Sequence, residues 1–517
     1  MRYLVSGAQM KEIDRFTICD VGIPSLVLME RAAMAVAEES HRAAGPGGRI
    51  FAAAGLGNNG ADAVAAARML KEKGHPVSVI LAGDPERGTE ELKLQLKIAE
   101  RLGVEVELFG DFIPGRCEVL IDGVFGVGLN RPVTGHYGEF LRFLQGISAK
   151  TVVAVDVPSG VSSDTGALLG PALRADVTVT FGYEKLGTAV YPGKDFRGRL
   201  VVADAGFPAE AARHAGVSAF TYEPEDVKRL PARPAYSHKG TFGKVLVVAG
   251  WKNMAGAAGL VGLAAYRMGA GLVKLLTPEE NREILQTLLP EAVMIPYEKD
   301  LLFQEGGLSR EDVEGLCREA SAVVLGPGLG REKGAGELVR AVLSSACSPV
   351  VLDADGLNAV ADNEELTRYF TENIIITPHL LEMSRLLHIP VEEIKKDIPG
   401  TARACADRWG ITCVLKDAAT AVAGGDGSLY INSSGCAAMA KGGSGDVLSG
   451  IIGALLAQGM SEPEAAALGV CVHGLAGERA SAARGERAVL ARDLADALGE
   501  VCQISQEIRK KEVNGNE

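Results

Sequence analysis

The sequence lacks the features that mark secreted, membrane-spanning and zinc-binding proteins. Its nine cysteines are scattered over 517 residues, and none forms a C-x-x-C pair. This favours reduced thiols over a disulfide framework or a zinc site. The N-terminal stretch "MRYLVSGAQMKEIDRF" has no apolar core of a signal peptide, and the longest apolar runs are shorter than a membrane span. We therefore expect a cytoplasmic enzyme with no membrane partner.

Positive charge is scarce as well. The chain has 53 Lys and Arg against 66 Asp and Glu, which gives a net charge of −13. This excess of negative charge argues against nucleic acid as a partner. An anionic substrate would have to be met locally, by helix N-termini and single lysines.

The sequence does contain two series of short apolar runs that alternate with helical patterns. Because the runs are apolar on both faces, they predict parallel sheets covered by helices on both sides, an α/β fold. An opening helix is expected after Ser6, a candidate N-cap. Between residues 208 and 235 the pattern breaks into a segment rich in Pro, Ala and charge. We place the boundary there and expect domains at 1–215 and 216–517.

The loop in "FAAAGLGNNGADAVAAARML" matches the dinucleotide-binding fingerprint G-x-G-x-x-G through Gly55, Gly57 and Gly60. An NAD-dependent oxidoreductase is therefore one hypothesis. The acidic residue that this hypothesis needs could be Asp84, but it lies in a Gly-Asp-Pro turn rather than at a strand tip. No second catalytic motif supports the hypothesis.

Polar residues follow several strands of the first half, at the edge where ligands bind in open parallel sheets. The oxygen donors Asn59, Asp122 and Ser159 suit a hard cation. Asp156 and Lys185 form a candidate acid/base pair. Taken singly, each could be a turn or capping residue, and Lys185 could be a solvated loop lysine.

In the second half, "MAKGGSGDVLSGIIGALL" predicts a glycine-rich turn that leads directly into a helix, which makes an anion site. Asp446 in its first turn could take a proton from a hydroxyl that attacks a phosphate, or it could be a plain N-cap. The loop has no G-K-[ST] and so differs from a Walker A loop.

Weaker signals surround this loop. "LKDAAT" (416–420 and the preceding Leu) fits a nucleotide phosphate or ribose site, and "LGPGLG" is a turn that could lie against a flat ligand. His379 ends a strand, where a lone histidine is more often structural. Asp353 and Asp355 could hold Mg²⁺ through water, or Asp355 could cap the next helix.

Together these motifs resemble a known family over nearly the full length, the bifunctional NAD(P)H-hydrate repair enzymes. The first half is similar to the YjeF N-terminal type of epimerase domain, a Rossmann-like three-layer αβα sandwich. The second is similar to the ADP- or ATP-dependent dehydratase, a ribokinase-like αβα domain. The stretches that carry the resemblance are "GLGNNGAD", "IDGVFGVGLNRP", "VAVDVPSG", "FGYEKLG", "HKGTFGKVLVVAG", "LGPGLG", "LDADGLN", "TPHLLEM", "LKDAAT" and "KGGSGDVLSGIIGALLAQG".

The resemblance implies two linked reactions. Water adds to C6 of the nicotinamide ring of NADH or NADPH and gives R and S hydrates, NADHX and NADPHX. The first domain would interconvert these epimers with the help of K⁺. The second would use ADP or ATP with Mg²⁺ to phosphorylate the S hydrate and eliminate phosphate, which restores the cofactor. Further copies of the chain, in a homo-oligomer, are the remaining expected partner.

The resemblance also implies residue roles. Asp156, with Lys185 near it, would face the nicotinamide. Asn59, Asp122 and Ser159 would hold the potassium ion. The remaining hydrate and phosphate contacts of the epimerase would be Asn58, Asn59, Gly60, Ala61, Asp62, Gly126, Val127, Gly128, Leu129, Asn130, Arg131 and Pro132.

In the dehydratase, the resemblance makes Asp446 the base that activates the hydroxyl. It would share the hydrate pocket with Ala257, Gly328 and His379. The adenine nucleotide would be held by Lys416, Asp417, Ala418, Ala419, Thr420 and Gly445.

Three positions depart from the family pattern. The family loop reads N-N-G-G-D-G, whereas this chain has Ala61 and Ala63. Alanine would cost about 1 kcal/mol if these positions needed positive φ, and it is harmless in a first helical turn, which we favour. Asp417 replaces a usual glycine and would place a negative charge near the nucleotide phosphate.

Two alternatives remain open from sequence alone. The chain could be a ribokinase-like small-molecule kinase with a non-catalytic N-terminal ligand-binding domain. A kinase would accumulate a stable phosphorylated product, whereas the dehydratase releases inorganic phosphate. The N-terminal half could also be a scaffold whose loop has lost activity.

Overall fold

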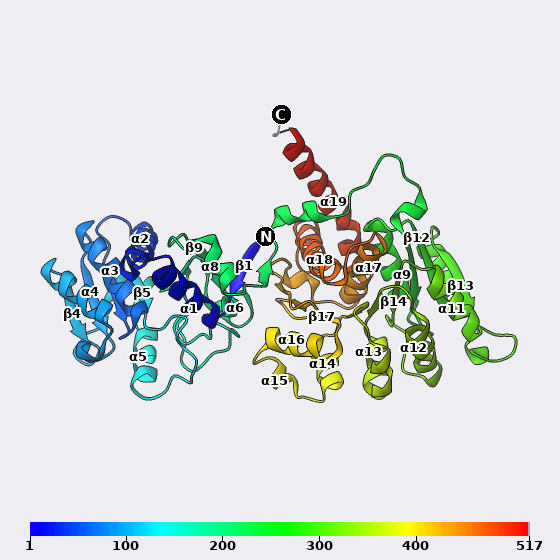
Figure 1. Ribbon diagram of the computed structural model, residues 1–517, viewed down its shortest axis with the longest axis horizontal. Helices are drawn as coiled ribbons and strands as arrows, with labels where there is room; N and C mark the ends of the chain where they lie inside the picture. Colours follow the sequence, from blue (N-terminus) through cyan, green and yellow to red (C-terminus); the bar gives the residue numbers. More distant parts are fainter. Residues whose placement is uncertain (515–517) are drawn as a thin grey trace. The chain divides into compact units, whose positions relative to one another are not determined.

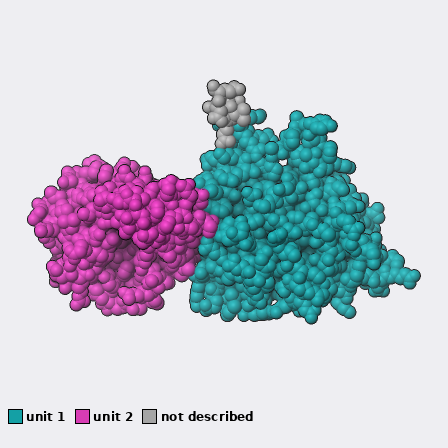
Figure 2. All heavy atoms as spheres, in the orientation of Figure 1, with its two compact units in different colours: residues 1–2, 220–517 teal, residues 3–219 magenta. Residues whose placement is uncertain are grey.

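The computed structural model describes residues 1–514 and divides the chain into two compact units (Figure 1). The N-terminal unit comprises residues 3–219, and the C-terminal unit comprises residues 1–2 together with the chain from 220 onward (Figure 2). The division falls within the segment 208–235, where the alternating sequence pattern breaks. Among residues 1–514, none of the helices combines the length and apolar character needed to cross a bilayer.

The N-terminal unit is built on a seven-stranded sheet with the order β4-β3-β2-β5-β6-β7-β9. Every neighbouring pair in it is parallel. The strands of this unit are β1 (Arg2–Val5), β2 (Ile50–Ala54), β3 (Val77–Leu81), β4 (Glu105–Leu108), β5 (Arg116–Gly123), β6 (Ser148–Val155), β7 (Val177–Phe181), β8 (Glu184–Lys185) and β9 (Arg199–Ala203). Its α-helices are α1 (Gly7–Arg15), α2 (Ser25–Ala44), α3 (Asn58–Glu72), α4 (Glu90–Arg101), α5 (Gly135–Gln145), α6 (Leu186–Ala189), α7 (Gly193–Phe196) and α8 (Ala209–His214).

Alternation along the strands produces three layers in this unit. In β2, Ile50, Ala52 and Ala54 face a core shared with α2, α3 and α4. The intervening Phe51 and Ala53 face a second core on the side of α5. All five residues of β2 are buried, as expected for a central parallel strand covered on both faces.

The opening helix α1 begins where the sequence predicts. The Ser6 hydroxyl accepts from the Gln9 amide, and the Gln9 side chain accepts from the Ser6 amide, which completes a capping box. The helix continues through a π-helical turn, η1 (Phe16–Asp20). This fixed start determines which face of α1 meets the rest of the unit.

The C-terminal unit carries a mixed sheet with the order β13-β12-β11-β14-β15-β16-β17-β18-β19-β10. Pairing is parallel from β13 to β17 and antiparallel from β17 to β19. The strands are β10 (Ala219–Thr221), β11 (Lys244–Val248), β12 (Leu272–Pro278), β13 (Val293–Tyr297), β14 (Ala322–Leu325), β15 (Val350–Leu352), β16 (Ile374–Ile376), β17 (Thr412–Leu415), β18 (Ala421–Ala423) and β19 (Leu429–Ile431). The α-helices are α9 (Ala255–Arg267), α10 (Arg282–Leu288), α11 (Arg310–Glu319), α12 (Lys333–Ser345), α13 (Asp355–Asp362), α14 (Leu380–Leu387), α15 (Val391–Ile394), α16 (Ile398–Trp409), α17 (Ser444–Ala457), α18 (Glu462–Arg484) and α19 (Ala491–Asn514).

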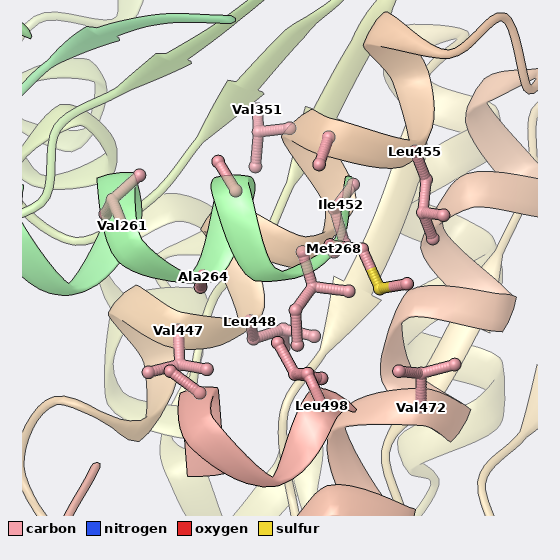
Figure 3. Close-up of a cluster of buried hydrophobic side chains, with 14 of the residues drawn as sticks. Val261, Ala264, Met268, Val351, Val447, Leu448, Ile452, Leu455, Val472 and Leu498 are labelled. Atoms are coloured by element: carbon pink, nitrogen blue, oxygen red, sulfur yellow. The ribbon is translucent and has the colours of Figure 1, made fainter. Parts of the chain in front are cut away.

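Helix α17 is the centre of this unit's core. Every residue from Val447 to Ala457 is buried, so the helix is apolar on all sides. It packs against α9, with α18 and α19 beside it (Figure 3). A Cβ atom at Gly450 would lie 2.3 Å from the carbonyl oxygen of Val261 on α9. Glycine at this position therefore sets the close approach of the two helices.

We expect the Gly450→Ala substitution to destabilise the C-terminal unit by about 1–3 kcal/mol, because the added methyl group overpacks the contact with α9. The matched control is Gly315→Ala in α11, where a Cβ atom would meet nothing within 4 Å. That change should stabilise the unit by about 0.5–1 kcal/mol through the lower entropy of the unfolded chain. Urea unfolding of both variants tests this, and equal shifts of the same sign would contradict the account.

Candidate active sites

The carboxyl edge of the N-terminal sheet opens into a cavity of about 530 Å³. Its walls come from α1, α2 and the loops that follow β2, β5, β6 and β7. The predicted residues that line it are Asn58, Asn59, Asp62, Gly126, Val127, Gly128, Leu129, Asp156 and Lys185. The polar groups at separate strand ends thus converge as the topology of a parallel sheet requires.

Other predicted residues of this site lie outside the cavity wall. Gly60 and Ala61 are buried in the first turn of α3, and Asn130, Arg131 and Pro132 are exposed. Asp122 and Ser159 are fully buried. They do not face the cavity but contact a loop that lines it. Asp122 accepts from the Val124 amide, and Ser159 accepts from the Phe125 amide.

Lys185 and Asp156 form a buried ion pair, which excludes the solvated-lysine alternative. The two side chains are 1% and 9% exposed, and Lys185 Nζ lies 2.5 Å from Asp156 Oδ1. Lys185 also donates to the hydroxyl of Thr180 at 2.9 Å, and Thr180 donates to Asp156 Oδ1 at 3.0 Å. Asp156 has φ of 68°, a strained value for a non-glycine residue. The carboxylate is therefore held in one orientation by charge, hydrogen bonds and backbone geometry.

Asp122 is a buried carboxyl group whose partners are hydrogen-bond donors. Ser159 donates its hydroxyl to Oδ1 at 2.5 Å and its amide to Oδ2 at 2.8 Å. Burial raises the pKa of Asp122 to about 6, and the bonds from Ser159 oppose this rise. In the described part of the chain, the buried Nδ2 of Asn59 has no hydrogen-bond partner. Asp122 is the only carboxylate among these three side chains, and both of its oxygens accept from Ser159.

The two alanines of the Asn58–Ala63 segment are compatible with its conformation. Asn58 is the first residue of α3, and neither Ala61 nor Ala63 has a positive φ. Ala61 is therefore in the first helical turn, as expected, whereas Ala63 is the sixth residue of α3 and lies in the second turn, where alanine is equally harmless. Gly60 has a different reason to be glycine, because its Cβ would lie 2.0 Å from the carbonyl oxygen of Gly55.

Two further carboxyl groups of the cavity have raised pKa values. Burial raises the pKa of Asp62 well above its usual range, and Asp156 and Asp14 add to this. Burial also raises the pKa of Asp14, to about 6, against the opposing effect of Lys185. Sequence reasoning missed Asp14. Its signal was a carboxylate beside the buried positions Met10 and Ile13 of an amphipathic helix.

In the C-terminal unit, a second ion pair, between the buried Asp353 and the partly exposed Lys416, lies at the carboxyl edge of the sheet. Lys416 Nζ is 2.9 Å from Asp353 Oδ1, and Ser449 on α17 donates to Asp353 Oδ2 at 2.6 Å. Burial lowers the pKa of Lys416, but Asp353 and Glu382 outweigh it, so the pKa is raised. Lys416 is therefore a fixed positive charge at this edge.

Asp446 lies in the first turn of α17, beside this pair. Burial raises its pKa to about 7, Asp353 adds to the rise, and Lys416 opposes it. The preceding turn depends on Gly443, whose φ of 92° favours glycine. A Cβ at Gly445 would lie 3.2 Å from Lys416 Nζ. The helix start, the lysine and a base with near-neutral pKa thus meet, an arrangement suited to phosphoryl transfer.

His379 has a structural role that the sequence left open. Its Nδ1 accepts from the amides of Leu381 and Glu382 at 3.1 and 3.2 Å, which caps α14. Its Nε2 lies 3.3 Å from Glu382 Oε1. Burial and Lys416 lower the pKa of His379. The ring is thus a neutral, fixed group. The backbone of His379 forms a β-bridge with that of Lys416, so the ring lies near the end of β17.

Ala257 and Gly328 are brought together as predicted. A Cβ at Gly328 would lie 2.9 Å from the Cβ of Ala257, and Gly328 has φ of 60°. Nearby, Asp355 begins α13 and accepts from the Gly330 amide at 2.8 Å. Asp355 therefore holds the turn 325–330 in place.

The segment from Lys416 to Thr420 leaves β17 in a turn. Ala419 and Thr420 are buried, whereas Asp417 is partly exposed and Ala418 is exposed. The Thr420 hydroxyl donates to the carbonyl oxygen of Asp417 at 3.1 Å. Any contact of this turn with a nucleotide would therefore come mainly from its backbone and from Asp417 and Ala418.

Comparison with known proteins agrees with the two-part organisation. Residues 25–187 match the family model described as YjeF-related protein N-terminus, and residues 245–500 match the model described as NAD(P)H-hydrate dehydratase. Among solved structures, the ADP/ATP-dependent NAD(P)H-hydrate dehydratase of Bacillus subtilis co-crystallised with ATP/Mg²⁺ is 30% identical. That likeness covers 55% of this chain and 98% of the other, with a TM-score of 0.46.

Full-length relatives extend the match to nearly the whole chain. The bifunctional NAD(P)H-hydrate repair enzyme Nnr of Moorella thermoacetica is 36% identical, over 98% of this chain and 97% of its own length. The enzyme of the same name from Escherichia coli is 34% identical, over 88% and 85%. The chain therefore belongs to the family of bifunctional NAD(P)H-hydrate repair enzymes.

Proposed function

We propose that the N-terminal cavity is the epimerase site and that the carboxyl edge of the C-terminal sheet is the dehydratase site. As a member of its family, the chain converts R and S hydrates of NAD(P)H into each other and restores NAD(P)H from the S hydrate with an adenine nucleotide. The observation that carries the assignment is that each unit places an ion pair of a lysine with a buried aspartate beside carboxyl groups of raised pKa. We also propose that the chain forms a homo-oligomer in the cytoplasm.

In the epimerase site, Asp156 faces the nicotinamide ring, and its ion pair with Lys185 orients its carboxylate. Asn58, Asn59 and Asp62 contact the hydrate from the first turn of α3. The loop 126–132 follows the dinucleotide phosphates. Its first four residues line the cavity, and Asn130, Arg131 and Pro132 continue along the surface.

The side chains around Asp122 fit a potassium ion. Asn59, Asp122 and Ser159 supply only oxygen ligands, as a hard monovalent cation prefers. Burial and hydrogen bonds set the pKa of Asp122, and no cationic side chain lowers it. A bound cation would therefore offset a buried negative charge. When bound, the ion would supply positive charge beneath the cavity and keep the Asn58–Asp62 turn in place.

In the dehydratase site, Asp446 takes the proton of the substrate hydroxyl as the terminal phosphoryl group is transferred to it. The first turn of α17 and Lys416 lie where they can stabilise the phosphate charge. Elimination of phosphate then restores the ring. Lys416 to Thr420 and Gly445 hold the adenine nucleotide, and Ala257, Gly328 and His379 hold the hydrate.

The same edge fits a magnesium–nucleotide complex. Asp353 and Asp355 raise the pKa of Asp446, while Lys416 opposes this rise. Mg²⁺ commonly binds through one or two carboxylates together with substrate phosphates. The ion would neutralise phosphate charge during transfer. A kinase would instead leave a stable phosphorylated product, and we expect inorganic phosphate.

We expect Asp446→Asn to lower the rate of S-hydrate dehydration by about 10²–10⁴-fold, because the variant lacks the base. The return of reduced-nicotinamide absorbance with ADP and Mg²⁺ measures it. Asp407→Asn, an exposed position on α16, is the matched control and should keep the wild-type rate. Epimerisation in the same chain should be unchanged in both variants.

The wild-type dehydration rate should also rise as pH increases through about 7, because Asp446 acts only after losing its proton and its pKa is raised to that value. A flat profile, or near-wild-type activity of Asp446→Asn, would contradict the role of this base.

For the cation, we expect K⁺ to raise the epimerisation rate and the Tm of the N-terminal unit relative to tetramethylammonium at equal ionic strength. K⁺ at a concentration a hundredfold above its dissociation constant should raise the free energy of unfolding of this unit by about 2.7 kcal/mol. Asp122→Asn should abolish both responses, because it removes the only carboxylate of the proposed ligand set. Identical behaviour of the wild type in the two salts would rule out the site.

A further inference from the structure

The epimerase cavity contains more carboxyl groups than its positive charge can balance. Asp14, Asp62, Asp156 and Lys185 all line it. Lys185 is paired with Asp156 at 2.5 Å. Within residues 1–514, neither Asp14 nor Asp62 forms a salt bridge. Lys11 also lines the cavity, but its side chain is exposed to solvent. Three carboxylates beside one buried ammonium group and one exposed ammonium group cannot all be charged without strong repulsion.

The cavity therefore retains a proton near neutral pH. Burial raises the pKa of Asp14 to about 6, and raises that of Asp62 well above its usual range. Asp156, in contrast, is paired with the ammonium group of Lys185. Two carboxyl groups whose environments favour opposite protonation states provide an acid and a base in one site.

Asp14 is also held firmly. It lies on α1, whose start is capped by Ser6, and whose Gly7 amide donates to Asp164 Oδ1 at 2.6 Å. Met10 and Ile13 of the same helix are buried in a small core with Val5 and Ala211. A rigid helix thus presents the carboxyl group to the cavity, as a catalytic group requires.

We propose that Asp14 is a catalytic residue of the epimerase and acts with Asp156 as the second member of an acid/base pair. The proposal rests on the assignment of this cavity as the epimerase site. Helix α1 lies ahead of the matched family segment, residues 25–187. Nothing in that match assigns a role to Asp14.

The reaction is a dehydration at C6 followed by a rehydration at the same carbon. Asp14 gives its proton to the C6 hydroxyl, the C6–O bond breaks with its electron pair on oxygen, and the N1 lone pair forms an N1=C6 double bond. Water then adds to the other face of C6 and passes a proton to the Asp156 carboxylate. The enzyme is left with Asp14 ionised and Asp156 protonated, which is the state that catalyses the reverse direction.

Asp14 fits the acid better than Asp62 does. Its pKa is raised to about 6, close to neutral pH, where proton transfer in both directions is fastest, and the capped helix α1 holds it in the cavity wall. Asp62 lies on α3 together with Asn58 and Asn59, so a role in binding the hydrate accounts for it.

The test is the conversion of purified R-NADHX to S-NADHX by the full chain without nucleotide, followed by chromatography. We expect Asp14→Asn to lower kcat about 100-fold or more with little change in KM. The matched control is Glu12→Gln on the same helix, whose side chain pairs with Arg15 outside the cavity and should leave the rate unchanged. Unchanged Tm and unchanged dehydration of S-NADHX show that the variant chain is folded.

A pH profile separates catalysis from a structural role. The groups that face Asp14 are Lys185, Asp156 and Asp62 across the cavity and Lys11 on its own helix. Wild-type kcat/KM for the R hydrate should fall as pH rises above about 6, where Asp14 loses its proton, and Asp14→Asn should lack this limb. A variant with more than half of the wild-type kcat, or one that keeps the limb, overturns the proposal. Failure of the wild type to epimerise would instead overturn the assignment of the cavity.

Discussion

Both units depend on a lysine that forms an ion pair with a buried aspartate at the carboxyl edge of parallel strands. Lys185 with Asp156 and Lys416 with Asp353 are the two pairs. Removing one partner of such a pair leaves an unpaired buried charge and costs about 3–5 kcal/mol, although a buried pair is no more stabilising than well-packed apolar residues. We therefore propose that the pairs serve as fixed charges in the two sites rather than as supports of the fold.

The fixed lysine sets the chemistry of the carboxyl groups around it. It pairs with one aspartate, while burial and that aspartate raise the pKa of a neighbouring carboxyl group. In the N-terminal unit the affected groups are Asp14 and Asp62, and in the C-terminal unit the affected group is Asp446. The same arrangement thus supplies a group that gives up or takes a proton near neutral pH in each unit.

Much of this could be predicted from the sequence because it follows from local patterns. Apolar runs identified the central strands such as β2, β5 and β11, and the edge rule of parallel sheets placed Asp156 and Lys185 together. The short or half-exposed strands β4, β9, β18 and β19 were not predicted, because their apolar content is too brief to stand out. The apolar pattern could not predict that Lys185 is buried. Its burial depends on tertiary contacts with Thr180 and with Asp156, whose backbone is strained.

The glycines of "GLGNNGAD" show a further limit. Their spacing suggests dinucleotide binding, yet Gly55 and Gly60 are required by backbone contacts, at 2.1 Å from Val124 and 2.0 Å from Gly55 if a Cβ were present. Asp14 was missed because one carboxylate on an amphipathic helix looks like a solvated residue until the cavity is seen.

The central claim, that one chain carries two separate catalytic edges, is tested most directly by following both hydrates in one reaction. A mixture of R- and S-NADHX is incubated with ADP and Mg²⁺, and each epimer is resolved by chromatography. We predict that the wild type consumes both, while Asp156→Asn consumes S-NADHX at the wild-type rate and leaves R-NADHX to its slow spontaneous epimerisation. Loss of S-NADHX consumption in that variant, or rapid consumption of R-NADHX by it, would contradict the account.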